Sequence, residues 1–317
     1  MKPVLCVGDV CVDLIIPYAS ALKAKSGEPV AQDSTEVRPC HGGSVANTAC
    51  SIARLGVPVL FAGTCGKDLH GQFLKQGLVD DGVDCSLLRM DDSLSTQTVL
   101  LVLDANGERT AFAFPAHSGA QHAIVLSQFP QDLLDRIGWL HVSGMMLREE
   151  PAASTQLLLM ERCHKAGIPV SLDVNARVES LNDPAFRRNL MTAKEHCTVI
   201  FGSATDEIPL LTDQYDTETA AKILAEHGIA VIARSGSRGA VYYCGKTRIH
   251  SPAFLVSVAD TIGAGDTFDG AYIAACMRGL DPQTALREAN AAAAICVASH
   301  SGRACPTRSE LQSFLNN

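Results

Sequence analysis

The sequence lacks several features that would place it in other classes of protein. No apolar run reaches the roughly 18 residues that a membrane-spanning helix needs. The first strand-like segment begins at residue 4, too early to leave room for a signal peptide. Asp and Glu number 34 against 26 Lys and Arg, and the net charge of −8 argues against nonspecific nucleic-acid binding or a polybasic membrane surface. We therefore expect a cytoplasmic protein with neither a membrane nor a nucleic acid as partner.

Familiar metal and nucleotide motifs are absent as well. The 12 cysteines are scattered and the 10 histidines show no paired spacing typical of zinc ligands, so we expect reduced thiols packed as small apolar side chains. Gly245-Lys246-Thr247 resembles the end of a P-loop, but Ala240 stands where the first glycine of that motif belongs. Gly8-Asp9-Val10 stands where a dinucleotide-binding fingerprint would begin. These differences argue against a P-loop NTPase and against a dehydrogenase.

What the chain does contain is a regular alternation of strand-like and helical segments. Continuous apolar runs predict buried parallel strands at residues 4–7, 59–62, 139–142, 170–172, 199–201 and 231–233. Helical patterns lie between them, at residues 45–55, 154–165 and 217–227, and each is followed by a glycine suited to end a helix. Repeated β–α units of this kind predict a doubly wound α/β domain with a mostly parallel sheet.

Two stretches interrupt this alternation. Residues 98–103 and 109–114 are strand-like and flank the turn sequence Asp104-Ala105-Asn106-Gly107, which together predict a hairpin. Residues 14–38 show no helical period. We interpret segments 14–38 and 95–116 as a small β appendage that stands off the main sheet, within a single domain covering residues 1–317.

Segment 260–270 is the most informative about a catalytic site. In this segment a glycine-rich turn leads into a helix. Apolar residues after Gly265 recur at helical spacing, so the first N–H groups of this helix lack intrahelical partners and favour an anion. Asp266 would then lie at the mouth of an anion site, where a carboxylate repels a bound phosphate. Its presence makes sense if it takes a proton from an attacking hydroxyl while the N–H groups hold a phosphoryl group. The alternative is an aspartate that only caps the helix.

A second glycine-rich turn precedes another helix. Gly42 and Gly43 expose N–H groups that could bind hydroxyls, and Asn47, one turn into the helix, could add a side-chain amide. Asp13, just past the first strand, is suited to accept hydrogen bonds from two hydroxyls of a polyol. The plainer alternatives are a flexible helix entry with Ser44 as its N-cap, and a solvated loop aspartate.

Taken together, these segments resemble the two signatures of the ribokinase-like (PfkB) family of carbohydrate and nucleoside kinases. Gly42-Gly43-x-x-x-Asn47 is similar to the first signature, and segment 260–270 is similar to the second, which is highly specific. The two occur in the family's order, so the resemblance covers nearly the whole chain. It implies a three-layer α/β/α domain with a small β lid, a homodimer formed through that lid, and transfer of the ATP γ-phosphate to a hydroxymethyl group.

The same resemblance implies roles for particular residues. The catalytic set would be a base and an anion hole, formed by Asp266 and by Gly263, Ala264 and Gly265. The sugar site would be lined by polar residues and glycines, namely Asp13, Gly42, Gly43 and Asn47. ATP would lie against the loop 235–239 and a residue near the adenine, that is, against Ser235, Gly236, Gly239 and Asn290. A monovalent cation, usually K⁺, would be held by Asp260 and the carbonyl of Ile262.

One family motif departs from the usual pattern. The family carries Asn-x-x-Glu at a strand end, linked to Mg²⁺ and phosphate binding, but segment 202–207 contains no asparagine. Either Asp206 or Glu207 could supply the acid, acting through water on the metal. The sequence does not decide which of these two adjacent acids has that role.

Two arginines bear on the acceptor. Asp173-Val174-Asn175-Ala176-Arg177 is similar to a segment of fructokinases and 2-keto-3-deoxygluconate kinases, and Arg177 could bind a carboxylate or a hydroxyl pair. Arg109, on the returning strand of the hairpin, would approach the sugar when the lid closes. Surface solvation or an ion pair is the alternative for each. Because only 5% of the residues are aromatic, we expect a sugar or sugar acid as substrate. A nucleoside kinase and a non-catalytic sugar or nucleotide sensor are the alternatives.

Overall fold

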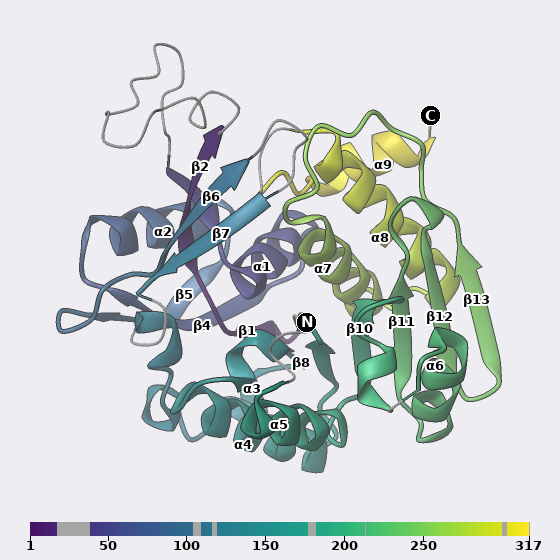
Figure 1. The fold of residues 1–317 in the computed structure, drawn as a ribbon, viewed down its shortest axis with the longest axis horizontal. Helices are drawn as coiled ribbons and strands as arrows, with labels where there is room; N and C mark the ends of the chain where they lie inside the picture. The colour runs from purple at the N-terminus through teal and green to yellow at the C-terminus, as the bar shows by residue number, and fades with distance from the viewer. Residues whose placement is uncertain are drawn as a thin grey trace.

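The main sheet of the protein is built from nine strands (Figure 1). The computed structural model describes residues 1–17, 39–103, 109–115, 119–176, 182–212, 214–299 and 303–316. In sheet order the strands are β13 (Thr247–Ser251), β12 (Ala240–Cys244), β11 (Ala230–Arg234), β10 (Val199–Ser203), β9 (Val170–Asp173), β8 (Trp139–Ser143), β1 (Val4–Val7), β4 (Val59–Gly66) and β5 (Asp84–Asp91). All neighbours from β11 to β5 pair in parallel, while β12 and β13 add an antiparallel edge. The predicted doubly wound, mostly parallel sheet is confirmed.

Helices cover both faces of this sheet (Figure 1). One face carries α1 (Ser44–Arg54), α2 (Leu69–Asp80), α7 (Ala264–Met277), α8 (Pro282–Val297) and α9 (Arg308–Asn316). The other carries α3 (Leu133–Arg136), α4 (Ala152–Lys165), α5 (Pro184–Lys194) and α6 (Thr217–Glu226). Successive residues of a strand point to opposite faces, so Val4 and Cys6 of β1 pack in the first core while Leu5 and Val7 pack in the second. The predicted three layers follow from these two cores.

The helix boundaries follow local sequence signals. Gly56, Gly167 and Gly228 adopt φ values of 83°, 70° and 82° just after α1, α4 and α6, as expected of glycines that end helices. At the other end, aspartate side chains accept hydrogen bonds from the first N–H groups of α2, α5, α6 and α8.

A second, four-stranded sheet lies beside α2 on the left in Figure 1. Its order is β3 (Pro39–Gly42), β2 (Cys11–Pro17), β6 (Thr98–Leu103) and β7 (Arg109–Phe114). The antiparallel pair of β6 and β7 has the bounds predicted for the hairpin, and the sheet matches the predicted lid. The first lid strand begins at residue 11 rather than 14, and residues 18–38 and 104–108 lie outside the described part. The division of residues 1–317 into a single domain remains a prediction.

Three further properties concern the described residues alone. None of their helices is both long enough and apolar enough to cross a membrane. All 12 cysteines lie in this part of the chain and no disulfide joins any of them. No group of three or more His, Cys, Asp or Glu side chains is arranged there to hold a metal ion.

Candidate active site

The carboxyl ends of the parallel strands bring polar residues together at one edge of the main sheet. Asp9 follows β1, Asp173 ends β9 and Arg234 ends β11. A cavity of about 630 Å³ opens at this edge, below the small sheet. Its polar lining includes Asp9, Asp13, Ser44, Asn47, Asn175 and Asp266, and β6 and β7 supply Val99, Leu101, Ala111 and Ala113. In open α/β sheets this edge is where ligands bind, and we call the space the acceptor cavity.

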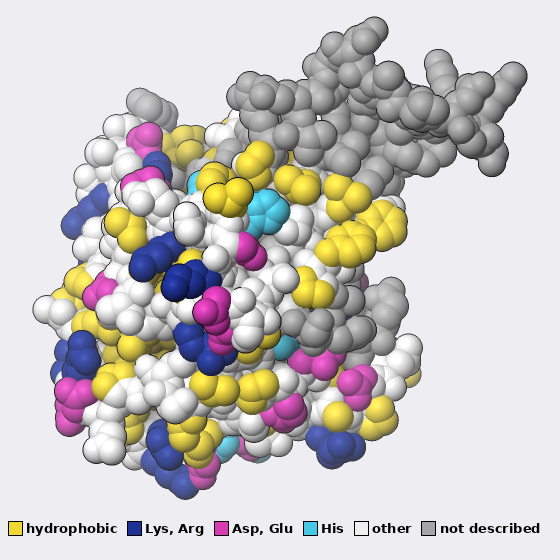
Figure 2. Space-filling view, turned by 90° about the vertical axis from the view of Figure 1, so that its left-hand side faces the viewer, with side chains coloured by type: hydrophobic (Ala, Val, Ile, Leu, Met, Phe, Trp, Pro, Cys, Tyr) yellow, Lys and Arg dark blue, Asp and Glu magenta, His cyan; other side chains and the backbone are white. Residues whose placement is uncertain are grey.

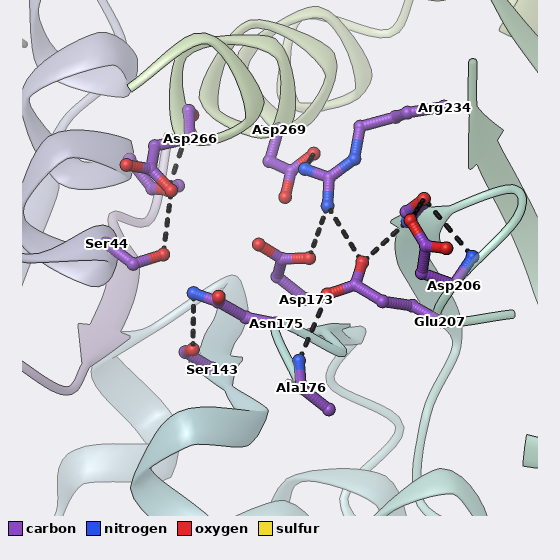
Figure 3. A network of polar contacts seen from close by, with 12 residues as sticks. Ser44, Ser143, Asp173, Asn175, Ala176, Asp206, Glu207, Arg234, Asp266 and Asp269 are labelled. Atoms are coloured by element: carbon purple, nitrogen blue, oxygen red, sulfur yellow. Dashed lines mark hydrogen bonds and ion pairs between the residues drawn. The ribbon is translucent and has the colours of Figure 1, made fainter. Parts of the chain in front are cut away.

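Asp266 faces the acceptor cavity from the first turn of α7 (Figure 3). Ser44 Oγ donates to Asp266 Oδ1 at 2.7 Å, and Asn47 Nδ2 donates to Oδ2 at 2.9 Å. The N-cap of α7 is Gly263, with a φ of 72°, and no side chain caps the helix. The alternative in which Asp266 serves only as a helix cap is therefore wrong.

The surroundings of Asp266 shift the pKa of its carboxyl group. Burial raises the pKa of this carboxyl to about 7, and the carboxylates of Asp173 and Asp9 act in the same direction. The hydrogen bonds from Asn47 and Ser44 lower the pKa and so offset part of this rise. A carboxylate with a pKa near 7 can accept a proton at neutral pH and remain partly ionised before it does so. The geometry thus supports a base at this position.

The turn before Asp266 presents backbone N–H groups at the start of α7. Gly263, Ala264 and Gly265 form this turn, and the first N–H groups of the helix have no intrahelical acceptor. A Cβ on Gly265 would lie 2.9 Å from Nη1 of Arg234, so glycine is needed for the turn to rest against that guanidinium group. The predicted anion hole therefore has an arginine directly behind it.

That arginine forms a buried ion-pair cluster that the sequence did not reveal (Figure 3). Nη2 of Arg234 lies 2.6 Å from Asp173 Oδ1 and 3.7 Å from Glu207 Oε2, and Nη1 lies 2.9 Å from Asp269 Oδ1. Burial alone would lower the pKa of Arg234, but the three carboxylates outweigh it and raise that pKa. We call these four residues the arginine cluster. It joins the ends of β9 and β11 to α7.

The cluster also distinguishes between the two acids left open for the metal-linked role. Glu207 accepts hydrogen bonds from the backbone N–H groups of Ser203 at 2.6 Å and Ala176 at 3.0 Å, in addition to its ion pair. Asp206 is exposed, and Ser203 Oγ donates to its Oδ2 at 3.2 Å. The carboxylate of Glu207 is thus held inside the protein by these contacts, whereas the carboxylate of Asp206 is open to solvent.

The predicted sugar-site residues come together around β2 and the start of α1. Asp13 lies within β2 rather than in a loop, and burial raises its pKa to about 6. A Cβ on Gly42 would lie 2.4 Å from Asp13 Oδ2, so this glycine makes room for the carboxylate. Gly43, with a φ of 99°, is the N-cap of α1, which replaces the expected Ser44 cap. Asn47 lines the cavity, but its amide N–H is directed at Asp266.

The residues predicted to bind ATP and K⁺ lie elsewhere along the same edge. Ser235, Gly236 and Gly239 form the loop after β11. Asn290 is buried and its Nδ2 donates to the backbone oxygen and to Oγ of Ser251, both at 3.0 Å, so its contact with adenine stays a prediction. For the cation, the backbone N–H of Ile262 donates to Asp260 Oδ1 at 2.9 Å, and the Ile262 carbonyl accepts a hydrogen bond from the Cys296 thiol.

An arginine that was not predicted lines the acceptor cavity. Arg177 lies outside the described residues, and for Arg109, which begins β7, only the backbone is described. Arg148 lines the acceptor cavity, although nothing in its sequence context singled it out, and the roles of Arg109 and Arg177 stay predictions. Asp9 was also missed; its carboxylate accepts hydrogen bonds from the backbone N–H groups of Ser44 and Val45, at 2.8 and 3.1 Å. Its place directly after a strand was an available signal.

This fold and site agree with comparisons to known proteins. Residues 1–308 match the family described as pfkB family carbohydrate kinase. The protein belongs to this family. It is 31% identical over 326 residues to the aminoimidazole riboside kinase of Salmonella typhimurium, which covers 100% of this chain and 96% of that protein.

Solved structures extend the comparison to bound ligands. A candidate ribokinase II of E. coli, solved with ATP and Mg²⁺, has a TM-score of 0.89 at 25% identity and covers 100% of this chain and 99% of its own. A fructokinase double mutant of Vibrio cholerae, solved with fructose, ADP and potassium, has a TM-score of 0.85 at 28% identity and covers 99% and 98%. The predicted family and fold are confirmed, and this PfkB protein is a sugar or nucleoside kinase, a phosphotransferase that acts on a hydroxyl group.

Proposed function

We propose that this PfkB kinase transfers the γ-phosphate of ATP to a primary hydroxyl of a sugar or sugar acid, with Asp266 as the base. The observation that carries the proposal is the position of that carboxylate. It faces the acceptor cavity beside the N-terminus of α7, held by two neutral donors, with its pKa raised to about 7. A protein that only binds sugar or nucleotide gains nothing from a carboxylate facing a phosphate, which argues against a sensor.

The reaction follows from this geometry. Asp266 accepts the proton of the acceptor hydroxyl as the hydroxyl oxygen forms its bond to the γ-phosphorus. The bond between that phosphorus and the β,γ-bridging oxygen breaks, and ADP leaves with the bonding electron pair. The N–H groups at Gly263–Gly265 would donate to the equatorial phosphoryl oxygens and stabilise the negative charge there. The strands β6 and β7 form one wall of the acceptor cavity. Exclusion of water from this space during the reaction would prevent hydrolysis of ATP.

We expect the nucleotide and its metal to bind along the same sheet edge. ATP would lie against Ser235, Gly236, Gly239 and Asn290. Mg²⁺ would be held through water by Asp206, because Glu207 is engaged by Arg234 and two backbone N–H groups. When bound, the metal neutralises charge on the phosphates. A metal with few protein ligands suits Mg²⁺, which keeps several waters. Asp206→Asn should raise the Mg²⁺ concentration needed for activity, and an unchanged requirement would contradict the assignment.

A monovalent cation and a dimer are further parts of the proposal. K⁺ would be held by Asp260 and the carbonyl of Ile262. The homodimer would form through the lid, because the edge strand β7 exposes Phe112 and Phe114, which are 46% and 57% accessible. Figure 2 shows apolar side chains gathered on the side of the molecule that carries the small sheet. A monomeric mass in light scattering would contradict the dimer.

The central test is an ADP-release assay across sugars, sugar acids and nucleosides, run with and without K⁺ and with Mg²⁺ withheld as a control. We expect phosphorylation of a sugar or sugar acid, with a rate that falls below pH 7 because Asp266 must be deprotonated. At pH 6 the ionised fraction, and with it the rate, should be about a tenth of its plateau value. Turnover of nucleosides alone would contradict the proposed acceptor, and a rate independent of pH between 5 and 8 would contradict the proposed base.

A further inference from the structure

The acceptor cavity continues into a smaller space of about 110 Å³, which we call the side pocket. The two spaces share lining residues, namely Asp9, Gln97, Ala113, Met145 and Arg148. The side pocket adds residues from two segments that do not line the main cavity at these positions, which are Gln121, His122, Met146 and Glu149. A group attached to an acceptor molecule in the main cavity could therefore extend into this space.

Gln121 is the buried polar group of the side pocket. Gln121 is only 2% exposed, and neither its Oε1 nor its Nε2 has a hydrogen-bond partner among the described residues. Leaving a buried amide unsatisfied costs about 1–3 kcal/mol. Since nearly all buried polar groups in proteins have a partner, an amide left in this way next to a pocket points to a ligand as the missing partner.

Arg148 is the cationic group of the side pocket. It is exposed, and no hydrogen bond or ion pair engages its guanidinium group within the described part of the chain. None of the other described residues that line either space is a lysine or an arginine. Glu149 also lines the side pocket, but it is engaged in another interaction. The guanidinium group of Arg148 is thus available to a ligand that enters from the main cavity.

Charged side chains are spread unevenly along the combined space. The carboxylates of Asp9, Asp13 and Asp266 gather in the main cavity, where they can accept hydrogen bonds from hydroxyls but repel an anionic group. Arg148 and Asp9 both line the main cavity and the side pocket, but Asp9 already accepts hydrogen bonds from two backbone N–H groups, whereas Arg148 is open to a ligand. A molecule complementary to this arrangement carries hydroxyls that face the aspartates and a negative charge that reaches Arg148.

We propose that the side pocket is a specificity subsite that binds a carboxylate carried by the acceptor, through Arg148 and Gln121. This inference rests on the proposed kinase function and narrows its substrate to sugar acids. Arginine binds a carboxylate through two parallel N–H···O bonds, and Nε2 of Gln121 adds a third donor. The pocket volume equals that of about three to four water molecules at ~30 Å³ each, which is enough for a carboxylate group.

The first experiment compares aldonic and 2-keto sugar acids with the neutral aldoses and ketoses of equal carbon number. For each, kcat/KM is measured in the wild type, in Arg148→Gln and in Arg162→Gln. Arg162 is an exposed arginine of α4 that does not line the acceptor cavity or the side pocket and so serves as the matched control. We expect Arg148→Gln to lower kcat/KM for the acid by about 10- to 100-fold and for the neutral sugar by less than about threefold, since the lost interaction involves two charges. Arg162→Gln should match the wild type.

A second experiment measures binding without turnover. Thermal shifts caused by the sugar acid and by the neutral sugar are recorded in the absence of ATP, for the wild type, Arg148→Gln and Gln121→Glu. The glutamate keeps the shape of Gln121 but places a negative charge in the side pocket, so the shift caused by the acid should disappear while that of the neutral sugar remains. The melting temperature of each variant without ligand reports whether it folds.

Failure of this inference can be separated from failure of the kinase function. If no acceptor is phosphorylated but the acid binds in an Arg148-dependent way, the proposed function is wrong and the subsite stands. If neutral sugars are phosphorylated without preference for the acid, or if Arg148→Gln weakens acid and neutral sugar equally, the subsite is wrong. A rise in KM for ATP alone in Arg148→Gln would assign this arginine to the nucleotide and would also overturn the inference.

Discussion

Asp266 and Asp269 lie one turn apart on α7 and have opposite kinds of partner. Asp266 borders the acceptor cavity and accepts hydrogen bonds from two uncharged groups, Ser44 Oγ and Asn47 Nδ2. Asp269 is fully buried and its Oδ1 pairs with Nη1 of Arg234 at 2.9 Å. Burial raises the pKa of both carboxyls, but only Asp269 has a cation in contact to oppose that rise.

The difference separates a group that can exchange its proton from one that holds a structure together. A cation in contact with a carboxylate stabilises its charged form, whereas neutral donors orient the group and leave its pKa near neutrality. The arginine cluster fixes the ends of two strands against α7, while Asp266 keeps a proton affinity suited to a base. Three predictions test this comparison.

The largest effect on kcat is expected when Asp266 and Asp269 are each replaced by asparagine. Asp266→Asn should lower kcat by about 10²- to 10⁴-fold, because the acceptor hydroxyl loses its base, with little change in the affinity for ATP. Asp269→Asn should lower kcat by less than about tenfold, since Arg234 keeps Asp173 and Glu207 as partners. Steady-state kinetics with ADP release measure both variants.

Thermal melts provide the control for this pair. Asp266→Asn should shift the Tm by less than about 4 °C, so that its loss of activity does not reflect unfolding. Wild-type turnover in Asp266→Asn would remove the base assignment. An equal loss of kcat in both variants, with both folded, would contradict the assignment of Asp266 as the base and Asp269 as a structural ion-pair partner.

An intermediate effect is expected when Arg234 is neutralised. Arg234→Gln leaves Asp173, Glu207 and Asp269 without a cation and should destabilise the fold by about 3–5 kcal/mol in urea unfolding. The uncompensated negative charge should also raise the pKa of Asp266. Because that group acts when deprotonated, the acidic limb of the pH–rate profile should move up by about one pH unit.

Arg234→Lys separates charge from packing, since it keeps the cation but not the planar guanidinium group. We expect its pH–rate profile to stay within about 0.3 units of the wild type, although the protein is less stable. If Arg234→Gln loses stability and keeps the wild-type pH profile, the cluster has only a structural role.

The smallest effect is expected from removing one hydrogen bond to Asp266. Ser44→Ala deletes a donor to a carboxylate, so the pKa of Asp266 should rise by about one unit, equivalent to about 1.4 kcal/mol. The rate near pH 7 should fall by less than about tenfold and recover at higher pH. The matched control is Ser51→Ala, because Ser51 lies on the same helix and its Oγ donates to the backbone oxygen of Thr267 at 3.0 Å, away from the carboxylate. A pH profile shifted equally by both changes would contradict the role of Ser44.

The sequence predicted local elements well and assembled sites poorly. Each predicted strand, including the paired strands 98–103 and 109–114, lies where expected, because apolar runs act through neighbours in the chain. The glycine-rich turn before Asp266 could be identified for the same reason. Arg148 and Arg234 could not, since nothing close to them in the chain distinguishes them from other arginines on a protein surface.

Pairings across large separations also escaped prediction. Asn47 lines the acceptor cavity, and its role in sugar binding stays a prediction, but the hydrogen bond from its amide N–H to Asp266, 219 residues away in the chain, was not predicted. Asp206 and Glu207 are adjacent and chemically alike, so sequence alone left them equivalent. Their difference comes from β11, which places Arg234 beside Glu207 only.

The sequence by itself determined the alternation of strands and helices, the glycine turn at the start of α7 and the presence of an acid directly after it. Those features depend on the period of apolar residues and on backbone freedom, both of which are local. Tertiary structure alone decided which carboxylate received a cation, which received neutral donors, and which arginine reached the acceptor cavity. These depend on distances between segments far apart in the chain, and burial and electrostatic interactions are set by such distances rather than by order along the sequence.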